Sequence, residues 1–181
     1  MKTPDLRHWM CLVEAGYNPQ NIYLHGGPGQ LRGGKLTRYG RDHSDMGALF
    51  FTPETPDGWR YALGYAITKP DGGVYRCRLK LTANQIFDFS KPAHRRLAQR
   101  HLAPEEFQSW LTSARKNYLD WTAVDDERME EWGFRGAVFL EREAGHNAFA
   151  TDVLSIGIFH AEDAEIIDFT PKQELLAKMQ P

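Results

Sequence analysis

The sequence predicts an α+β fold. Short apolar runs with the length and composition of β-strands form one group before residue 90 and a second group after residue 132. These runs lie at 48–52, 73–81, 136–141, 153–159 and 165–168. Between the groups, residues 90–132 have apolar side chains at helical spacing. Strands that follow one another, instead of alternating with helices, favour α+β over a doubly wound parallel sheet.

Composition limits the classes of protein that fit. A chain of 181 residues suits one domain, 1–181, and its net charge of −2 gives no electrostatic case for a nucleic-acid or membrane partner. The two cysteines, Cys11 and Cys77, are too few for a cysteine-based metal site and suit a reducing compartment. No apolar run is long enough to span a membrane. We therefore expect a cytoplasmic protein, or one delivered into a host cell without a signal peptide.

The first half of the chain contains the expected elements around a long loop. Apolar residues recur at spacings of three and four in 4–15, which predicts an amphipathic helix. A short strand at 21–25 leads into a glycine-rich loop, 26–47, whose length is typical of a functional segment. After the buried strand at 48–52, Asp57 is placed to cap a helix over 58–68.

The second half begins with a strand that is exposed on one face. Arg76, Arg78 and Lys80 alternate with apolar residues, a pattern that Val74 interrupts, and we expect 85–89 to continue this strand. Two or three helices should follow. One of them is capped by Ser90, another starts at Pro104, and a third lies near 125–132. A final short helix should open at Thr170.

Few residues have the type and spacing expected of a catalytic or ligand-binding site. His25 ends a strand and is followed by Gly26 and Gly27, which let a ligand approach the backbone closely. The loop closes with neither a Walker signature nor a Rossmann fingerprint. His43 and Asp45 supply too few ligands for a metal site, and the basic segment around His94 to His101 reads as solvated surface.

The order of three motifs resembles the ADP-ribosyltransferase fold, in its His-Tyr-Glu branch. Leu24-His25-Gly26-Gly27 stands where the family has Tyr/Phe-His-Gly-Thr, and Phe50-Phe51-Thr52 matches its Tyr-Phe-Ala/Thr. Tyr61 follows Thr52 by nine residues, the spacing of the second stacking tyrosine in the poly(ADP-ribose) polymerases. The strand at 74–77 is similar to that of rifampin ADP-ribosyltransferase, and 133–168 to the closing hairpin of bacterial and phage-borne transferases.

This resemblance implies an ADP-ribosyltransferase-like fold with split antiparallel sheets, in which 90–132 forms a helical insert. It also implies NAD as co-substrate. His25 would bind the ribose hydroxyls, the backbone of Gly26 would receive the nicotinamide amide, and Phe50 and Tyr61 would hold the ring between them. The other residues of this expected cofactor site are Gly27, Arg32 and Tyr65. The loop bases Lys35, Arg38 and Arg41, with Arg32, could pair with the phosphates.

In the family, a glutamate on a late strand supports the reaction, because an oxocarbenium-like transition state needs a nearby carboxylate. This chain has no glutamate at that place, and Asp152 and Ser155 are the candidates for the catalytic position. Glutamates on either side of the matching strand remain alternatives. They are Glu141, Glu143, Glu162 and Glu165.

The implied activity is transfer of one ADP-ribose to a macromolecule, with a protein as the expected acceptor. A small transferase of this kind could be a bacterial toxin or effector, or a phage-borne modifier of host proteins. Three alternatives stay open. One is a binding module with the same fold and no activity, and another is an enzyme that modifies a small molecule such as an antibiotic. The third is an unrelated α+β protein in which these aromatic residues only form core.

Overall fold

The computed structural model describes residues 16–29, 31, 36, 47–141 and 153–179. The expected helix at 4–15 and most of the loop at 26–47 lie outside these residues. In chain order the structure contains β1 (Ile22–Gly27), β2 (Leu49–Pro53), α2 (Pro56–Ile67), β3 (Gly73–Leu79), β4 (Ile86–Phe87), α3 (Pro92–His101), α4 (Pro104–Ser113), α5 (Asp126–Glu131), β5 (Gly136–Glu141), β6 (Val153–Ile158), β7 (Ala164–Pro171) and α6 (Lys172–Met179).

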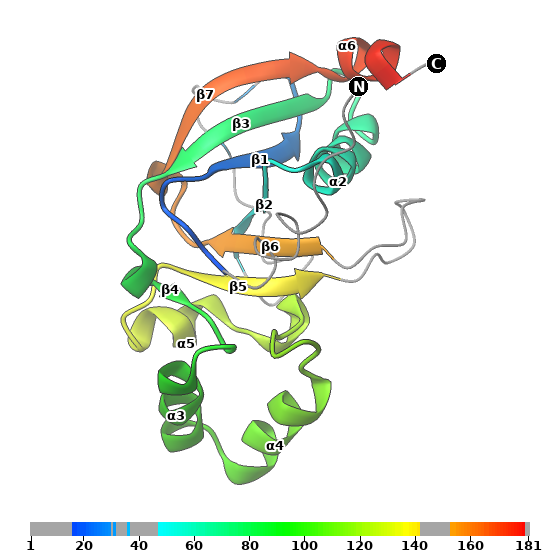
Figure 1. The fold of residues 1–181 in the computed structure, drawn as a ribbon. Helices are drawn as coiled ribbons and strands as arrows, with labels where there is room; N and C mark the ends of the chain where they lie inside the picture. The colour runs from blue at the N-terminus through cyan, green and yellow to red at the C-terminus, as the bar shows by residue number, and fades with distance from the viewer. Residues whose placement is uncertain (1–15, 30, 32–35, 37–46, 142–152, 180–181) are drawn as a thin grey trace.

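The strands form one sheet in the order β4-β5-β6-β2-β1-β3-β7. All neighbouring pairs are antiparallel except β4 and β5, which are parallel. The structure therefore confirms a mixed fold with a mostly antiparallel sheet. In Figure 1, β1, β3 and β7 lie together beside α2, whereas β5 and β6 lie on the other side of β2, toward α3, α4 and α5.

Strand β2 divides its pairing between two neighbours. Its last two residues pair with β1, as Thr52 with Leu24 and Pro53 with Tyr23. Its first three residues, 49–51, pair instead with β6. The ladder between β1 and β2 is therefore short, and β1 continues beyond Leu24 with β3 as its partner.

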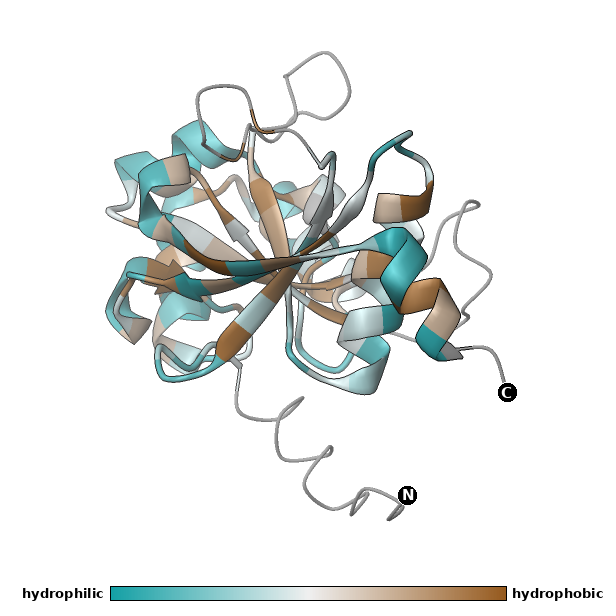
Figure 2. Cartoon of the chain, turned by 90° about the horizontal axis from the view of Figure 1, so that it is seen from above, coloured by the Kyte–Doolittle hydropathy of each residue, from teal (hydrophilic) through white to brown (hydrophobic). Residues whose placement is uncertain are grey.

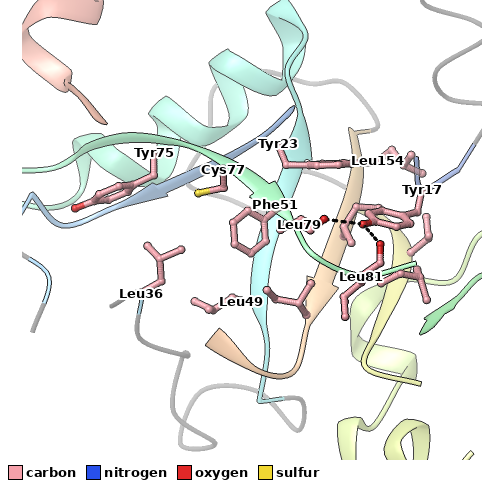
Figure 3. Packing of buried hydrophobic residues seen from close by; sticks show 14 of the residues in the cluster. Tyr17, Tyr23, Leu36, Leu49, Phe51, Tyr75, Cys77, Leu79, Leu81 and Leu154 are labelled. Atoms are coloured by element: carbon pink, nitrogen blue, oxygen red, sulfur yellow. Dashed lines mark hydrogen bonds between the residues drawn. The ribbon is translucent and has the colours of Figure 1, made fainter. Parts of the chain in front are cut away.

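One apolar core contains side chains from strands on both sides of β2. Phe51 lies within it with no exposed surface, together with Tyr23 of β1, Tyr75 of β3 and Ile156 of β6. Tyr17 closes one end of this core, where its hydroxyl donates to the carbonyl of Leu81 at 2.7 Å (Figure 3). Burial raises the pKa of Tyr17 to about 12, so its phenol stays protonated and remains a donor.

A second core lies under the helices between β4 and β5 and is rich in aromatic rings. Phe87 contacts Trp110, Trp132 and Phe134 at centroid distances between 5.2 and 6.1 Å. In Figure 2 the apolar colour follows the strands through the centre, and the helices around them are largely hydrophilic. Burial of these large rings is the main reason why the helical segment docks on the sheet.

Several element boundaries differ from those expected. Asp57 is not the cap of α2, because the side chain of Thr55 accepts from the amide of Gly58 at 3.0 Å and begins the helix. Lys91, not Ser90, occupies the N-cap position of α3, and no side-chain hydrogen bond caps this helix. Residues 86–87 do not continue β3, because they pair with β5. Thr170 does not begin the last helix, because it lies in β7.

The last helix is tied to α2. The backbone amide of Lys172 donates to the carbonyl of Gly72 at 3.0 Å. Its ammonium group donates to the carbonyls of Ile67 and Lys69, at the C-terminal end of α2. Figure 1 shows α6 above that end of α2, after the long edge strand β7.

Candidate functional site

The site is built where β1 and β2 separate. Glu54 donates its amide to the carbonyl of Ile22 at 3.0 Å, so the peptide groups of Ile22 point toward β2. The N–H and C=O groups of successive residues in a strand point to opposite neighbours. The N–H and C=O groups of Leu24 and Gly26 therefore also point toward β2. Leu24 meets Thr52, but the ladder ends there. The N–H and C=O of Gly26 thus face the separation between β1 and β2, with no strand partner there in the described chain.

His25 lies beside this separation and is buried, with 8% of its surface exposed. Its ring lies 5.2 Å from that of Phe51 and 6.4 Å from that of Tyr75, measured between centroids. The Nδ1 atom is 2.8 Å from the carbonyl oxygen of Phe50 on β2. The imidazole therefore bridges the two strands by its side chain, next to the point where their backbones stop pairing.

The contact with Phe50 assigns the tautomer of His25. A carbonyl oxygen only accepts hydrogen bonds, so Nδ1 carries the proton and Nε2 has the free electron pair. Burial lowers the pKa of His25 from its ordinary 6.5, and the bond to Phe50 partly offsets this effect. At neutral pH the ring is uncharged, and Nε2 is suited to accept a hydrogen bond from a hydroxyl.

Helix α2 covers Gly26 at close range. A Cβ atom at Gly26 would lie 1.9 Å from the carbonyl oxygen of Ala62 and 3.0 Å from the Cβ of Tyr65. Only glycine allows this approach. The same face of α2 carries Tyr61, whose hydroxyl is 3.2 Å from that of Tyr65. Tyr61 is mostly buried, whereas 39% of Tyr65 is exposed.

The tyrosines of α2 thus lie on the face of β1 to which Gly26 is turned, whereas the His25 side chain lies on the other face, toward Phe51 and Tyr75. The ring of Phe50 packs 6.4 Å from that of Phe139, at the edge of the second core. A Cβ atom at Gly27 would lie 3.3 Å from Nε2 of His25, so this glycine lies beside the free nitrogen of the ring.

Ser155 is the one candidate for the catalytic position that the structure describes fully. It is completely buried on β6, and its hydroxyl donates to the carbonyl of Phe51 at 3.4 Å. Asp152 lies outside the described residues, as do Arg32 and Glu143, and of Glu141 only the backbone is described. Glu165 pairs with Arg78 on β3, and Glu162 lies near Arg135.

Sequence reasoning did not single out Tyr75 as part of this site. Tyr75 stands opposite His25 in the β1–β3 ladder, and its hydroxyl donates to the carbonyl of Pro28. Its ring also packs 4.5 Å from that of Phe169. The alternation in 73–81 places Tyr75 on the apolar face, but the pairing register that aligns it with His25 is a long-range property.

The remaining features add no second site. Within the described ranges, no three histidine, cysteine or acidic side chains gather as metal ligands, and none of the helices there is long and apolar enough to cross a membrane. The thiol of Cys77 is buried in the first core, and burial raises its pKa to about 12. No family model, curated protein or solved structure matches the chain.

Proposed function

We propose that this protein is an NAD-dependent mono-ADP-ribosyltransferase that modifies a macromolecule, most simply a protein. The observation that carries the proposal is the end of the β1–β2 ladder at Leu24. It leaves the backbone N–H and C=O of Gly26 directed toward β2 without a strand partner among the described residues, next to His25 on β1. A primary carboxamide is the group that pairs with one donor and one acceptor arranged in this way.

The surrounding groups suit the rest of a nicotinamide riboside. Nε2 of the neutral His25 can accept a hydrogen bond from a ribose hydroxyl. Tyr61 and Tyr65 lie on the helix that covers Gly26 and supply aromatic surface for the pyridine ring. The division of β2 between β1 and β6 agrees with the split sheets that the sequence resemblance implies.

The reaction breaks the bond between the ribose C1′ and the nicotinamide nitrogen, and nicotinamide leaves with the electron pair. A nucleophile of the acceptor then bonds to C1′ and loses a proton. Charge on the ribose in the transition state requires a carboxylate. We assign this role to Asp152, because it directly precedes β6, where Ser155 occupies the neighbouring candidate position.

Calorimetric titration with NAD tests the binding step. We expect the wild type to bind NAD, His25→Ala to lose at least tenfold in affinity, and His101→Ala on α3 to bind as the wild type does. Wild-type protein that does not bind NAD, or unchanged affinity after His25→Ala, would contradict the proposal. Transfer is tested by incubation with labelled NAD and a host-cell extract, with release of nicotinamide as the second measurement.

A binding module without activity is the second candidate. It is favoured by Ser155, which has no carboxylate and is fully buried. The two candidates differ in turnover alone. A module binds NAD in the same calorimetric experiment and releases no nicotinamide, and its behaviour is unchanged by Asp152→Asn. A transferase loses nicotinamide release on Asp152→Asn and retains NAD binding.

A further inference from the structure

We propose that His25 is a positioning residue that holds β1 and β2 apart, because its side chain takes the carbonyl of Phe50 that the backbone of Gly26 would otherwise bind. The use of the resulting opening by a carboxamide rests on the proposed function. The separation of the strands does not rest on that function, because it is observed in the backbone pairing and in the contact of His25 with Phe50.

The register of the two strands defines what His25 prevents. The ladder pairs Leu24 with Thr52. In an antiparallel ladder the next bonded pair lies two residues along each strand, which would join Gly26 to Phe50. No such pair forms. The carbonyl of Phe50 instead accepts from Nδ1 of His25 at 2.8 Å.

The imidazole is held firmly enough to act in this way. Phe51 and Tyr75 lie on β2 and β3, the strands that flank β1 in the sheet, and both rings contact the imidazole. Tyr75 is fixed in turn by its bond to Pro28 and by the ring of Phe169. A buried side chain confined by packing keeps its donor aimed at one acceptor, at little further cost in entropy.

In a variant without the imidazole, the carbonyl of Phe50 loses the donor Nδ1. A carbonyl gains from a new donor, so the nearest N–H along the register should take the place of Nδ1. That N–H belongs to Gly26, which already faces β2. One further pair would then form, and the peptide group that the carboxamide needs would be consumed by the sheet.

Two substitutions separate this role from contact with ribose. In His25→Asn the amide nitrogen lies close to the position of Nδ1, so the bond to Phe50 is retained while the acceptor Nε2 is lost. His25→Ala loses both. Thr52→Val is the matched control on β2, because it removes the side-chain bond to the carbonyl of Gly58 and leaves the β1–β2 backbone register alone.

Amide hydrogen exchange of the free protein, followed by NMR, tests the inference. We expect the Gly26 amide to exchange rapidly in the wild type, in His25→Asn and in Thr52→Val, and at least tenfold more slowly in His25→Ala. The amide of Tyr23, which faces β3, reports any general loss of stability. A Gly26 amide that is protected in the wild type, or that exchanges equally fast in His25→Ala, would overturn the inference.

Titration with nicotinamide then distinguishes the two proposals. If exchange at Gly26 follows the expected pattern and no variant binds nicotinamide or NAD, His25 still separates the strands and the proposed function fails. If nicotinamide binds the wild type and His25→Ala equally, the opening does not depend on His25 and the positioning role fails.

Discussion

At the scale of single residues, two adjacent glycines have different tasks. Gly26 lies against the backbone of α2, where a Cβ atom would be 1.9 Å from the carbonyl oxygen of Ala62. At Gly27 an added Cβ atom would instead meet a side chain, with Nε2 of His25 nearest at 3.3 Å. A backbone carbonyl in a helix cannot move aside easily, whereas the contact at Gly27 requires an adjustment of only a few tenths of an ångström.

We therefore expect Gly26→Ala to lower the free energy of unfolding by about 1–3 kcal/mol, the usual cost of an overpacked interior site. Gly27→Ala should change it by less than about 1 kcal/mol, because alanine also suits a strand better than glycine. Its methyl group would cover Nε2, so NAD affinity should fall. Urea denaturation and calorimetric titration measure the two effects. Equal stability of both variants would contradict the packing argument.

The sequence placed His25 at the end of a strand, but β1 continues through Gly27, so His25 and Gly26 both lie within it. The ligand-binding roles of these two residues stay predictions, and their spatial relation to other elements could not be read from the sequence. Tyr75 was missed because its place opposite His25 depends on strand register. Register is set by packing over the whole sheet, which local spacing does not encode.

At the scale of elements, α2 depends on its first turn. The side chain of Thr55 accepts from the amide of Gly58 and satisfies one of the free N–H groups of the helix. Helix α4 has no such side chain, because Ala103 occupies its capping position. Helix α2 can therefore test the loss of an N-terminal side-chain cap, and α4 can test the gain of one.

Thr55→Ala should lower the free energy of unfolding by about 1 kcal/mol, and Ala103→Ser should raise it by about 0.5–1 kcal/mol. Both are measured by thermal or urea denaturation. Because α2 carries Tyr61 and Tyr65, Thr55→Ala should also weaken NAD binding, whereas Ala103→Ser should leave it unchanged. If Ala103→Ser lowered the free energy of unfolding, the N–H groups in the first turn of α4 would already have another partner.

Elements with a strong local signal were predicted well. The helix at 58–68 corresponds to α2, and the strand at 48–52 to β2. The capping residue was assigned wrongly because Thr55 and Asp57 are both good caps and only the path of the chain decides between them. Residues 85–89 were joined to the wrong strand because partners in a parallel pair are distant in sequence.

At the scale of the whole molecule, stability should depend on pH through His25. Its pKa in the folded protein is lowered from 6.5 by burial, so below pH 6.5 the unfolded chain takes up a proton that the folded chain resists. The histidine therefore favours folding above that pH, and its contribution is lost as the pH falls toward the folded pKa. The pKa of His94 is lowered in the same direction, also mainly by burial.

We expect the free energy of unfolding to decrease as the pH falls from 6.5 to 5, and to decrease less steeply in His25→Asn, which keeps the contribution of His94 and lacks that of His25. Urea denaturation at a series of pH values measures this. An identical pH dependence in the two proteins would mean that His25 is protonated as easily in the folded chain as in the unfolded one.

The mixed architecture followed from the grouping of the strands, and the structure confirms a mostly antiparallel sheet. The sharing of β2 between β1 and β6 could not be read from the sequence. The choice of neighbour for each part of β2 depends on how the sheet curves around Phe51 and the rest of the first core, and Pro53 has no N–H to donate to a neighbour.

The tie from Lys172 has an electrostatic consequence for α2. A helix has a partial negative charge at its C-terminal end, and α2 has no basic residue in its own last turn. The ammonium group of Lys172 supplies the missing counter-charge from more than a hundred residues away. Acetylation of this one amine would leave the macrodipole of α2 uncompensated, so a modification far from the two tyrosines would loosen the helix that carries them.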